Sequence, residues 1–217
     1  MLKSITMLSF FIKNRNYLIL YFTLAYVAAF AVNAYVHRNL EFIYYTILLV
    51  GLIYLVVYIH QYLRLGFFLI FNISLLGFFH LLGGNSYIGA VRLYEYYLAP
   101  NFFRYDNFVH SYASFIATIL LYTLTADFID ERARKRFGIV CLGLVLMTLG
   151  LGSINEILEF LAVIFFDAAQ QVGDYYNNSL DLVFNTVGSI IGCFVVYLYL
   201  ERPRILKKIH DKINQSN

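Results

Sequence analysis

Charged residues are scarce in this sequence, which excludes an ordinary soluble domain. Asp, Glu, Lys and Arg together make up 13% of the 217 residues, against about 25% in a typical soluble protein. Hydrophobic residues make up 61%, and several apolar runs approach the roughly 20 residues with which a helix crosses a bilayer. The composition therefore predicts an all-α polytopic membrane protein, built as a bundle of membrane-spanning helices.

Other features are also scarce or missing. The two cysteines, Cys141 and Cys193, both lie in apolar runs, so we expect small buried hydrophobes that say little about the redox compartment. No basic surface interleaved with aromatic residues is visible, which speaks against nucleic acid as a partner. No internal repeat or low-complexity linker divides the sequence, so we expect a single transmembrane domain over residues 1–217.

Six apolar segments are predicted to span the membrane. Their approximate bounds are 17–36, 42–59, 65–82, 107–126, 138–166 and 181–200. The first is longer than the hydrophobic region of a typical signal peptide, so we expect an uncleaved span. The fifth is longer than a bilayer core of about 30 Å requires, so it must tilt, kink or project from the core. The connections 83–106 and 167–180 are expected to pack on the membrane surface.

The distribution of basic residues predicts the orientation of the spans. With the N-terminus in the cytoplasm, 13 of the 16 Lys and Arg residues lie in cytoplasmic segments. The remaining three, Arg38, Arg92 and Arg104, lie outside. Both termini are therefore predicted to be cytoplasmic.

In this orientation, acidic and histidine side chains from four predicted spans gather in the outer half of the bundle. An ionisable group in hydrocarbon is costly unless it is paired or hydrated. We therefore expect one polar, water-accessible pocket that opens outward. Its candidate catalytic residues are Asp106, His110, Glu156, Glu159 and Asp181, and its candidate binding residues are His80, Arg104, Asp174 and Asn185.

Structural interpretations of the same residues remain open. His110 is alternatively a packing partner of Asp106, one helical turn away. Two adjacent buried acids repel each other unless a cation or a proton offsets them. On this structural interpretation, Glu156 and Glu159 form ion pairs that stabilise the fold. Their partners would be Arg92 or Arg104.

Glycines and tyrosines have structural interpretations of their own. Gly188 and Gly192 form a small-xxx-small pair, which predicts a close contact between helices. Gly83 and Gly84 permit a tight turn after the third predicted span. The tyrosines of "YEYYLAP", residues 94–100, are expected to lie at the membrane interface.

The segments "YDNFVH", "NEILEF" and "DYYNNSLDLVFNTVGSIIG" contain the patterns D-x-x-x-H, E-x-x-E and D-x-x-x-N-x-x-G-x-x-x-G in that order. Over residues 65–195 this set resembles the YjdF-type inner-membrane proteins of bacteria and archaea and, more distantly, the VanZ-like family. The resemblance implies a multi-pass plasma-membrane protein of unsettled activity, with envelope or lipid-linked chemistry on the VanZ-like side. The positions of interest that it implies are Asp106, His110, Glu156, Asp181 and Asn185.

Together these features predict a membrane protein whose polar site binds or acts on a lipid-linked or phosphate-containing envelope substrate, with membrane lipid as a partner. Clusters of His and carboxylates suit Zn or Mn, and carboxylates with water suit Mg, so a divalent metal is a possible cofactor. The sequence contains no compact signature such as H-E-x-x-H and no serine elbow, which leaves open whether the protein is an enzyme. The alternatives are a proton-coupled transporter or channel, and a non-catalytic scaffold or lipid-binding module.

Overall fold

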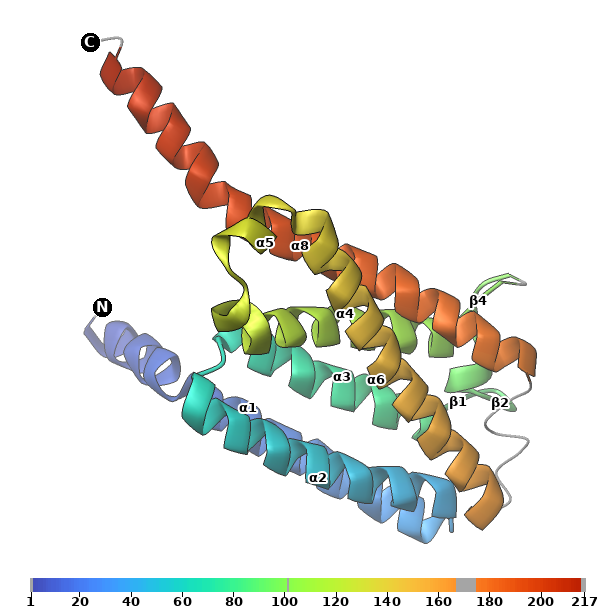
Figure 1. Cartoon of the computed structure of the whole chain (residues 1–217). Coiled ribbons are helices and arrows are strands. Elements are labelled where there is room, and N and C mark those ends of the chain that lie inside the picture. Colours follow the sequence, from blue (N-terminus) through green and yellow to red (C-terminus); the bar gives the residue numbers. More distant parts are fainter. Residues whose placement is uncertain (1, 101, 167–174, 216–217) are drawn as a thin grey trace. The chain divides into compact units, whose positions relative to one another are not determined.

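The computed structural model describes residues 2–100, 102–166 and 175–215, with side chains described for 14–100, 102–166 and 175–199. Six helices in these ranges are long and apolar enough to cross a membrane (Figure 1). They are α1 (Leu2–Val36), α2 (Leu40–Leu63), α3 (Phe67–Asn85), α4 (Tyr105–Thr125), α6 (Phe137–Phe166) and α8 (Tyr175–Gln215). The predicted all-α architecture with about six spans is confirmed.

The third span continues past its predicted end, and the tight turn predicted at Gly83 and Gly84 is wrong. Both glycines lie inside α3, which ends at Asn85. A Cβ atom at Gly84 would overlap the ring of Phe42, and one at Gly83 would come within 2.9 Å of aromatic ring atoms. These glycines therefore make room for packed rings and leave the direction of the chain unchanged.

The last two spans also differ from a simple apolar segment. α6 is one helix of 30 residues. At 1.5 Å per residue its length is about 45 Å, which exceeds a bilayer core of about 30 Å. α8 begins at Tyr175, before the predicted bound, because the polar residue Asn177 continues the helix and bonds to Asp181 one turn later.

The connection from α3 to α4 contains two short antiparallel strand pairs. β1 (Tyr87–Ile88) pairs with β2 (Val91–Arg92), and β3 (Tyr97–Ala99) pairs with β4 (Phe103–Arg104). A single turn of 3₁₀ helix, η1 (Leu93–Glu95), joins the two pairs. Within the predicted interfacial segment, Tyr96 and Tyr97 are exposed, whereas Tyr94 packs against Gly83 of α3.

The chain forms two compact units, and each is described by itself. Unit 1 comprises residues 1–109 and 155–181, and unit 2 comprises residues 110–154 and 182–217. The boundaries fall inside α4, α6 and α8, so each of these helices contributes a stretch to both units. The single transmembrane domain over residues 1–217 stays a prediction.

In unit 1, α1, α2 and α3 lie side by side and share an apolar core (Figure 1). Its buried side chains are Tyr26, Val27, Ala34, Phe42, Tyr45, Leu81 and Ala162. The Tyr26 hydroxyl donates to the carbonyl oxygen of Ser74 at 2.7 Å, which ties α1 to α3. The end of α3 that carries His80 is thereby fixed to a packed three-helix scaffold.

Unit 2 combines parts of α4, α6 and α8 with the short elements η2 (Ala126–Phe128) and α5 (Glu131–Lys135). Its apolar core contains Tyr122, Leu144, Cys193 and Val196, with Cys141 packed against them. A Cβ atom at Gly188 would overlap the backbone carbonyl of Ser111, and one at Gly192 would lie 2.7 Å from Thr118 Cβ. The close helix contact predicted for these glycines is confirmed, between α8 and α4.

Candidate functional site

Arg104 donates hydrogen bonds to two asparagine side chains in unit 1, at the start of α4. Its backbone N–H donates to Asn107 Oδ1 and its Nη1 donates to Asn177 Oδ1, each at 2.9 Å. An N–H group can only donate, so these bonds fix the orientation of both side-chain amides. The Nδ2 groups of the two asparagines consequently face Asp181. Asn107 Nδ2 donates to its Oδ1, and Asn177 Nδ2 donates to its Oδ2, both at 2.9 Å.

Asp181 is fully buried, with an exposed fraction of 0%, and each of its carboxylate oxygens faces a donor. Both oxygens therefore accept a hydrogen bond, an arrangement that favours the ionised carboxylate, which only accepts. A buried charge requires compensation, and Arg104 supplies a positive charge through Asn177. A hydrogen bond with the Tyr97 hydroxyl, at 3.1 Å, raises the pKa of Arg104 above its ordinary value, so the guanidinium stays charged.

Asp106 extends this network. Its Oδ2 accepts a hydrogen bond from Asn177 Nδ2 at 3.3 Å. One oxygen of Asp106 lies within 4.8 Å of an oxygen of Asp181. The amide of Asn177 thus contacts two carboxylates and one guanidinium, which makes it the central residue of the network.

The two glutamates of α6 form a second pair of carboxyl groups in unit 1. Both carboxylate oxygens of Glu156 are buried, and one lies within 4.8 Å of an oxygen of Glu159. Glu159 Oε1 accepts a hydrogen bond from Asn155 Nδ2 at 2.7 Å. The two acids lie three residues apart on α6, so their side chains share one face of the helix.

His80 of α3 and Tyr94 of η1 form a further polar contact in unit 1. The Tyr94 hydroxyl lies 2.6 Å from His80 Nδ1. Burial raises the pKa of Tyr94 well above its ordinary value, and the negative charges of Asp106 and Glu159 raise it further. Tyr94 therefore stays protonated and can donate to the imidazole.

Arg92 forms its ion pair with Glu41 and not with a glutamate of α6, which corrects one of the predicted alternatives. Arg92 Nη2 donates to Glu41 Oε2 at 2.9 Å, and both side chains are largely buried. The guanidinium also lies over the ring of Phe42, 4.8 Å from its centroid. The positive charge of Arg92 is thus matched within the connection between α3 and α4 and the start of α2.

In unit 2, the predicted residues His110 and Asn185 are both buried. Ser114 Oγ donates to Asn185 Oδ1 at 2.8 Å. Farther along α4, Thr118 Oγ1 and Thr148 Oγ1 lie 2.9 Å apart. Hydroxyl and amide groups therefore connect α4 with α8 and with α6 in this unit.

The predicted site residues are divided between the two units. Unit 1 contains His80, Arg104, Asp106, Glu156, Glu159 and Asp181, and unit 2 contains His110 and Asn185. Asp174 lies outside the described residues. The division of these residues into catalytic and binding roles stays a prediction.

Four polar residues of unit 1 were not among the predicted site residues, although three of them have a signal in the sequence. Glu41 is the only acid among the first 94 residues. Asn177 lies one helical turn before Asp181, the spacing at which side chains on a helix meet. Asn107 lies at the third position of α4 and reaches back to the backbone N–H before the helix, as in a capping box. The fourth, Tyr94, was grouped with interfacial tyrosines.

The fold and this network of buried carboxyl groups define a multi-pass membrane protein with a polar site built inside its helices. Residues 18–202 match the family described as "Predicted membrane protein (DUF2238)", and the chain belongs to this family. No protein of curated function and no solved structure matches the chain. The resemblance to YjdF-type proteins is compatible with this membership, and the more distant VanZ-like resemblance stays a prediction.

Proposed function

We propose that the acidic cluster of unit 1 binds a divalent cation, which in turn holds a phosphate-containing envelope substrate at the plasma membrane. The acidic cluster is defined here as Asp106, Glu156, Glu159 and Asp181. The observation that carries the proposal is the buried, doubly hydrogen-bonded carboxylate of Asp181 with a second carboxylate, that of Asp106, within 4.8 Å.

The oxygen–oxygen distances within each pair of the acidic cluster, Asp106 with Asp181 and Glu156 with Glu159, suit a hard cation. Mg²⁺ and Ca²⁺ bind carboxylate and amide oxygens at about 2.0–2.6 Å, so two oxygens within 4.8 Å can share one ion. The carboxyl groups of Asp106 and Asp181 share one guanidinium, that of Arg104, through Asn177, because Arg92 is matched by Glu41. Like charges gathered at this density require a counter-charge or bound protons, and a divalent cation supplies the former.

The cation also explains how such a cluster would accept a phosphate. The carboxylates alone repel an anion, whereas a bound cation attracts its oxygens. Arg104, which is only half-buried, is placed to donate to a phosphate from the edge of the network. The Tyr94 hydroxyl and His80 Nδ1 lie 2.6 Å apart, so this pair is suited to move a proton if the site is catalytic.

Binding of Mn²⁺ to the full chain in nanodiscs of zwitterionic lipid tests the cation. Mn²⁺ prefers the same oxygen ligands as Mg²⁺ and is visible by electron paramagnetic resonance. We expect Asp106→Asn and Glu159→Gln to weaken Mn²⁺ binding at least about ten-fold, a loss of ~1.4 kcal/mol. Glu159→Gln keeps the Oε1 atom that accepts from Asn155, so its fold should be preserved. The matched control is Glu95→Gln, an exposed acid of the same unit, which should bind as the wild type does.

The phosphate is tested in a second step with Mn²⁺ present. Short-chain phosphatidic acid and inorganic phosphate should both broaden the Mn²⁺ signal, whereas diacylglycerol of the same chain length should not. A response to phosphatidic acid but not to inorganic phosphate would assign the site to a lipid. The proposal is wrong if the wild type binds no Mn²⁺, or if Glu95→Gln weakens binding as much as the two cluster variants.

One observation favours a second candidate, a non-catalytic scaffold. Donors already face both oxygens of Asp181, as expected for a group that specifies helix packing. In that case Asp106→Asn, His110→Ala and Glu156→Gln should all lower the melting temperature clearly. A binding site predicts small or even stabilising effects, because functional sites retain unfavourable electrostatics.

A further inference from the structure

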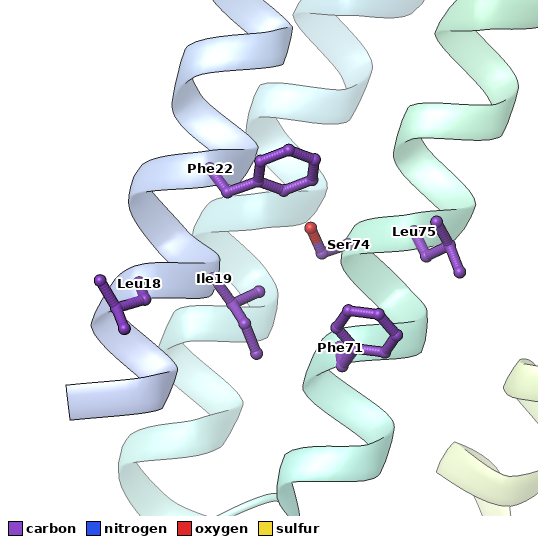
Figure 2. Close-up of a pocket in the computed structure, with 6 residues that line it drawn as sticks. All are labelled: Leu18, Ile19, Phe22, Phe71, Ser74 and Leu75. Atoms are coloured by element: carbon purple, nitrogen blue, oxygen red, sulfur yellow. The ribbon is translucent and has the colours of Figure 1, made fainter. Parts of the chain in front are cut away.

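A hollow in unit 1 between α1 and α3 has a wall that is apolar except for Ser74 (Figure 2). Its volume is about 250 Å³, and it is lined by Leu18, Ile19, Phe22, Phe71, Ser74 and Leu75. Ser74 adds no available polar group, because its hydroxyl is bonded to Thr23 Oγ1 at 2.6 Å and its carbonyl accepts from Tyr26. The volume falls below the roughly 300–1,000 Å³ of pockets for drug-sized ligands, so it suits part of one hydrocarbon chain.

A positive charge lies at one end of this hollow. Arg15 precedes Leu18 by one helical turn on α1, and helical side chains point toward the N-terminus of their helix. Its guanidinium carbon lies 4.8 Å from the centroid of the Phe67 ring. Phe67 in turn stacks on Phe71 of the wall, with centroids 6.1 Å apart and an interplanar angle of 18°. The guanidinium therefore lies at the end of the hollow where Phe67 stacks on Phe71.

The charge at this end is of one sign. Arg15 is exposed and forms no ion pair with an acid among the described residues. The sequence contains no Asp or Glu from residue 1 to residue 40 or from residue 42 to residue 94, whereas the same stretches contain Lys13, Arg15 and Arg64. A hollow that is lined by apolar side chains and ends at a guanidinium without an ion-pair partner among the described residues is complementary to a lipid with an anionic head group.

From this complementarity we infer a binding site for an anionic glycerophospholipid. One acyl chain occupies the hollow between α1 and α3, and the head-group phosphate contacts Arg15. The predicted orientation puts Arg15 at the cytoplasmic leaflet, which carries anionic lipid. This site is separate from the acidic cluster and does not depend on the proposed function, because it needs neither a divalent metal ion nor a carboxylate.

The absence of tryptophan from the chain allows a direct test. The variant Phe22→Trp places a single tryptophan on the wall of the hollow, which can be excited selectively over the tyrosines, and lipids with brominated acyl chains quench tryptophan on contact. In nanodiscs with a small fraction of brominated lipid, we expect phosphatidylglycerol to associate about five-fold more strongly than phosphatidylcholine, the preference expected for one cation near the surface. Adding Arg15→Gln should remove this preference, and adding Arg15→Lys should retain most of it.

Two controls define the outcome. Arg38→Gln removes the same charge from an exposed position elsewhere in unit 1, so the preference should persist in the Phe22→Trp background. Phe194→Trp puts the fluorophore on an exposed position of α8, where no preference is expected. Equal quenching by the two lipids, an unchanged preference in Arg15→Gln, or a Phe22→Trp that neither lipid quenches because another protein copy covers it would overturn the inference.

Discussion

Unit 1 and unit 2 bury polar side chains of different kinds. Among the described residues, the buried polar groups of unit 1 include the ions Glu41, Arg92 and Asp181. Those of unit 2 are, apart from His110, the neutral side chains Ser114, Thr118, Thr148, Asn185 and Ser189. Neutral groups inside a bilayer can satisfy one another across a helix contact, and they contribute modestly to stability. Buried ions need defined partners, and losing one partner is far more damaging.

The difference between the two units distinguishes buried polar groups that serve helix packing from those that are candidates for a function. In unit 2, hydroxyl and amide groups occur together with glycines at backbone contacts, so helix association accounts for them. In unit 1, the pair Arg92–Glu41 is matched, but the two carboxyl groups of Asp106 and Asp181 share the one guanidinium of Arg104 through Asn177. Packing alone does not explain that surplus, which is why the proposed site lies in unit 1.

The largest expected effect is on the matched ion pair. Glu41→Gln leaves the buried Arg92 guanidinium without a counter-charge, so we expect unfolding free energy to fall by about 3 kcal/mol. The measurement is denaturation of the full chain in mixed micelles. Glu95→Gln, an exposed acid in unit 1, should change stability by less than ~0.5 kcal/mol. Equal losses of unfolding free energy in the two variants would mean that the buried Glu41 stabilises the fold no more than the exposed Glu95, which would contradict the prediction.

The next effect tests packing in unit 2. Gly188→Ala would drive a methyl group into the Ser111 carbonyl, and backbone cannot move aside cheaply, so we expect a loss of about 2 kcal/mol. The control is Gly143→Ala in α6, where nothing lies within 4 Å of the added methyl. Alanine there should be neutral or stabilise the helix by up to about 1 kcal/mol. A Gly188→Ala variant as stable as Gly143→Ala would mean that α4 and α8 do not meet closely.

The number and type of the spans followed from the sequence because apolar length is a local property. The role of Gly84 did not follow, since its neighbour Phe42 belongs to another helix and only the folded chain brings them together. The predicted partner of Arg92 was wrong for the same reason, because the sequence contains several acids and no local pattern indicates Glu41 as the partner. Candidate acids were found because an ionisable residue in an apolar run is conspicuous, whereas asparagines such as Asn177 are not.

The smallest effect concerns the neutral side chains of unit 2. Ser114→Ala removes one hydrogen bond to Asn185, and we expect a loss of about 0.6 kcal/mol, the average for such bonds between membrane helices. The same denaturation assay measures it, with Thr123→Ala as control, because Thr123 is exposed and bonds only within its own helix. A loss as large as that of Glu41→Gln would contradict the distinction between the units.

The glycine at position 84 constrains which amino acids can occur elsewhere in the chain. Its missing side chain leaves space for the Phe42 ring, and that ring is the surface on which the Arg92 guanidinium lies. Any related chain with alanine at this position should therefore carry a smaller residue in place of Phe42. Covariation between these two positions, and next with the arginine, should be visible once relatives are aligned.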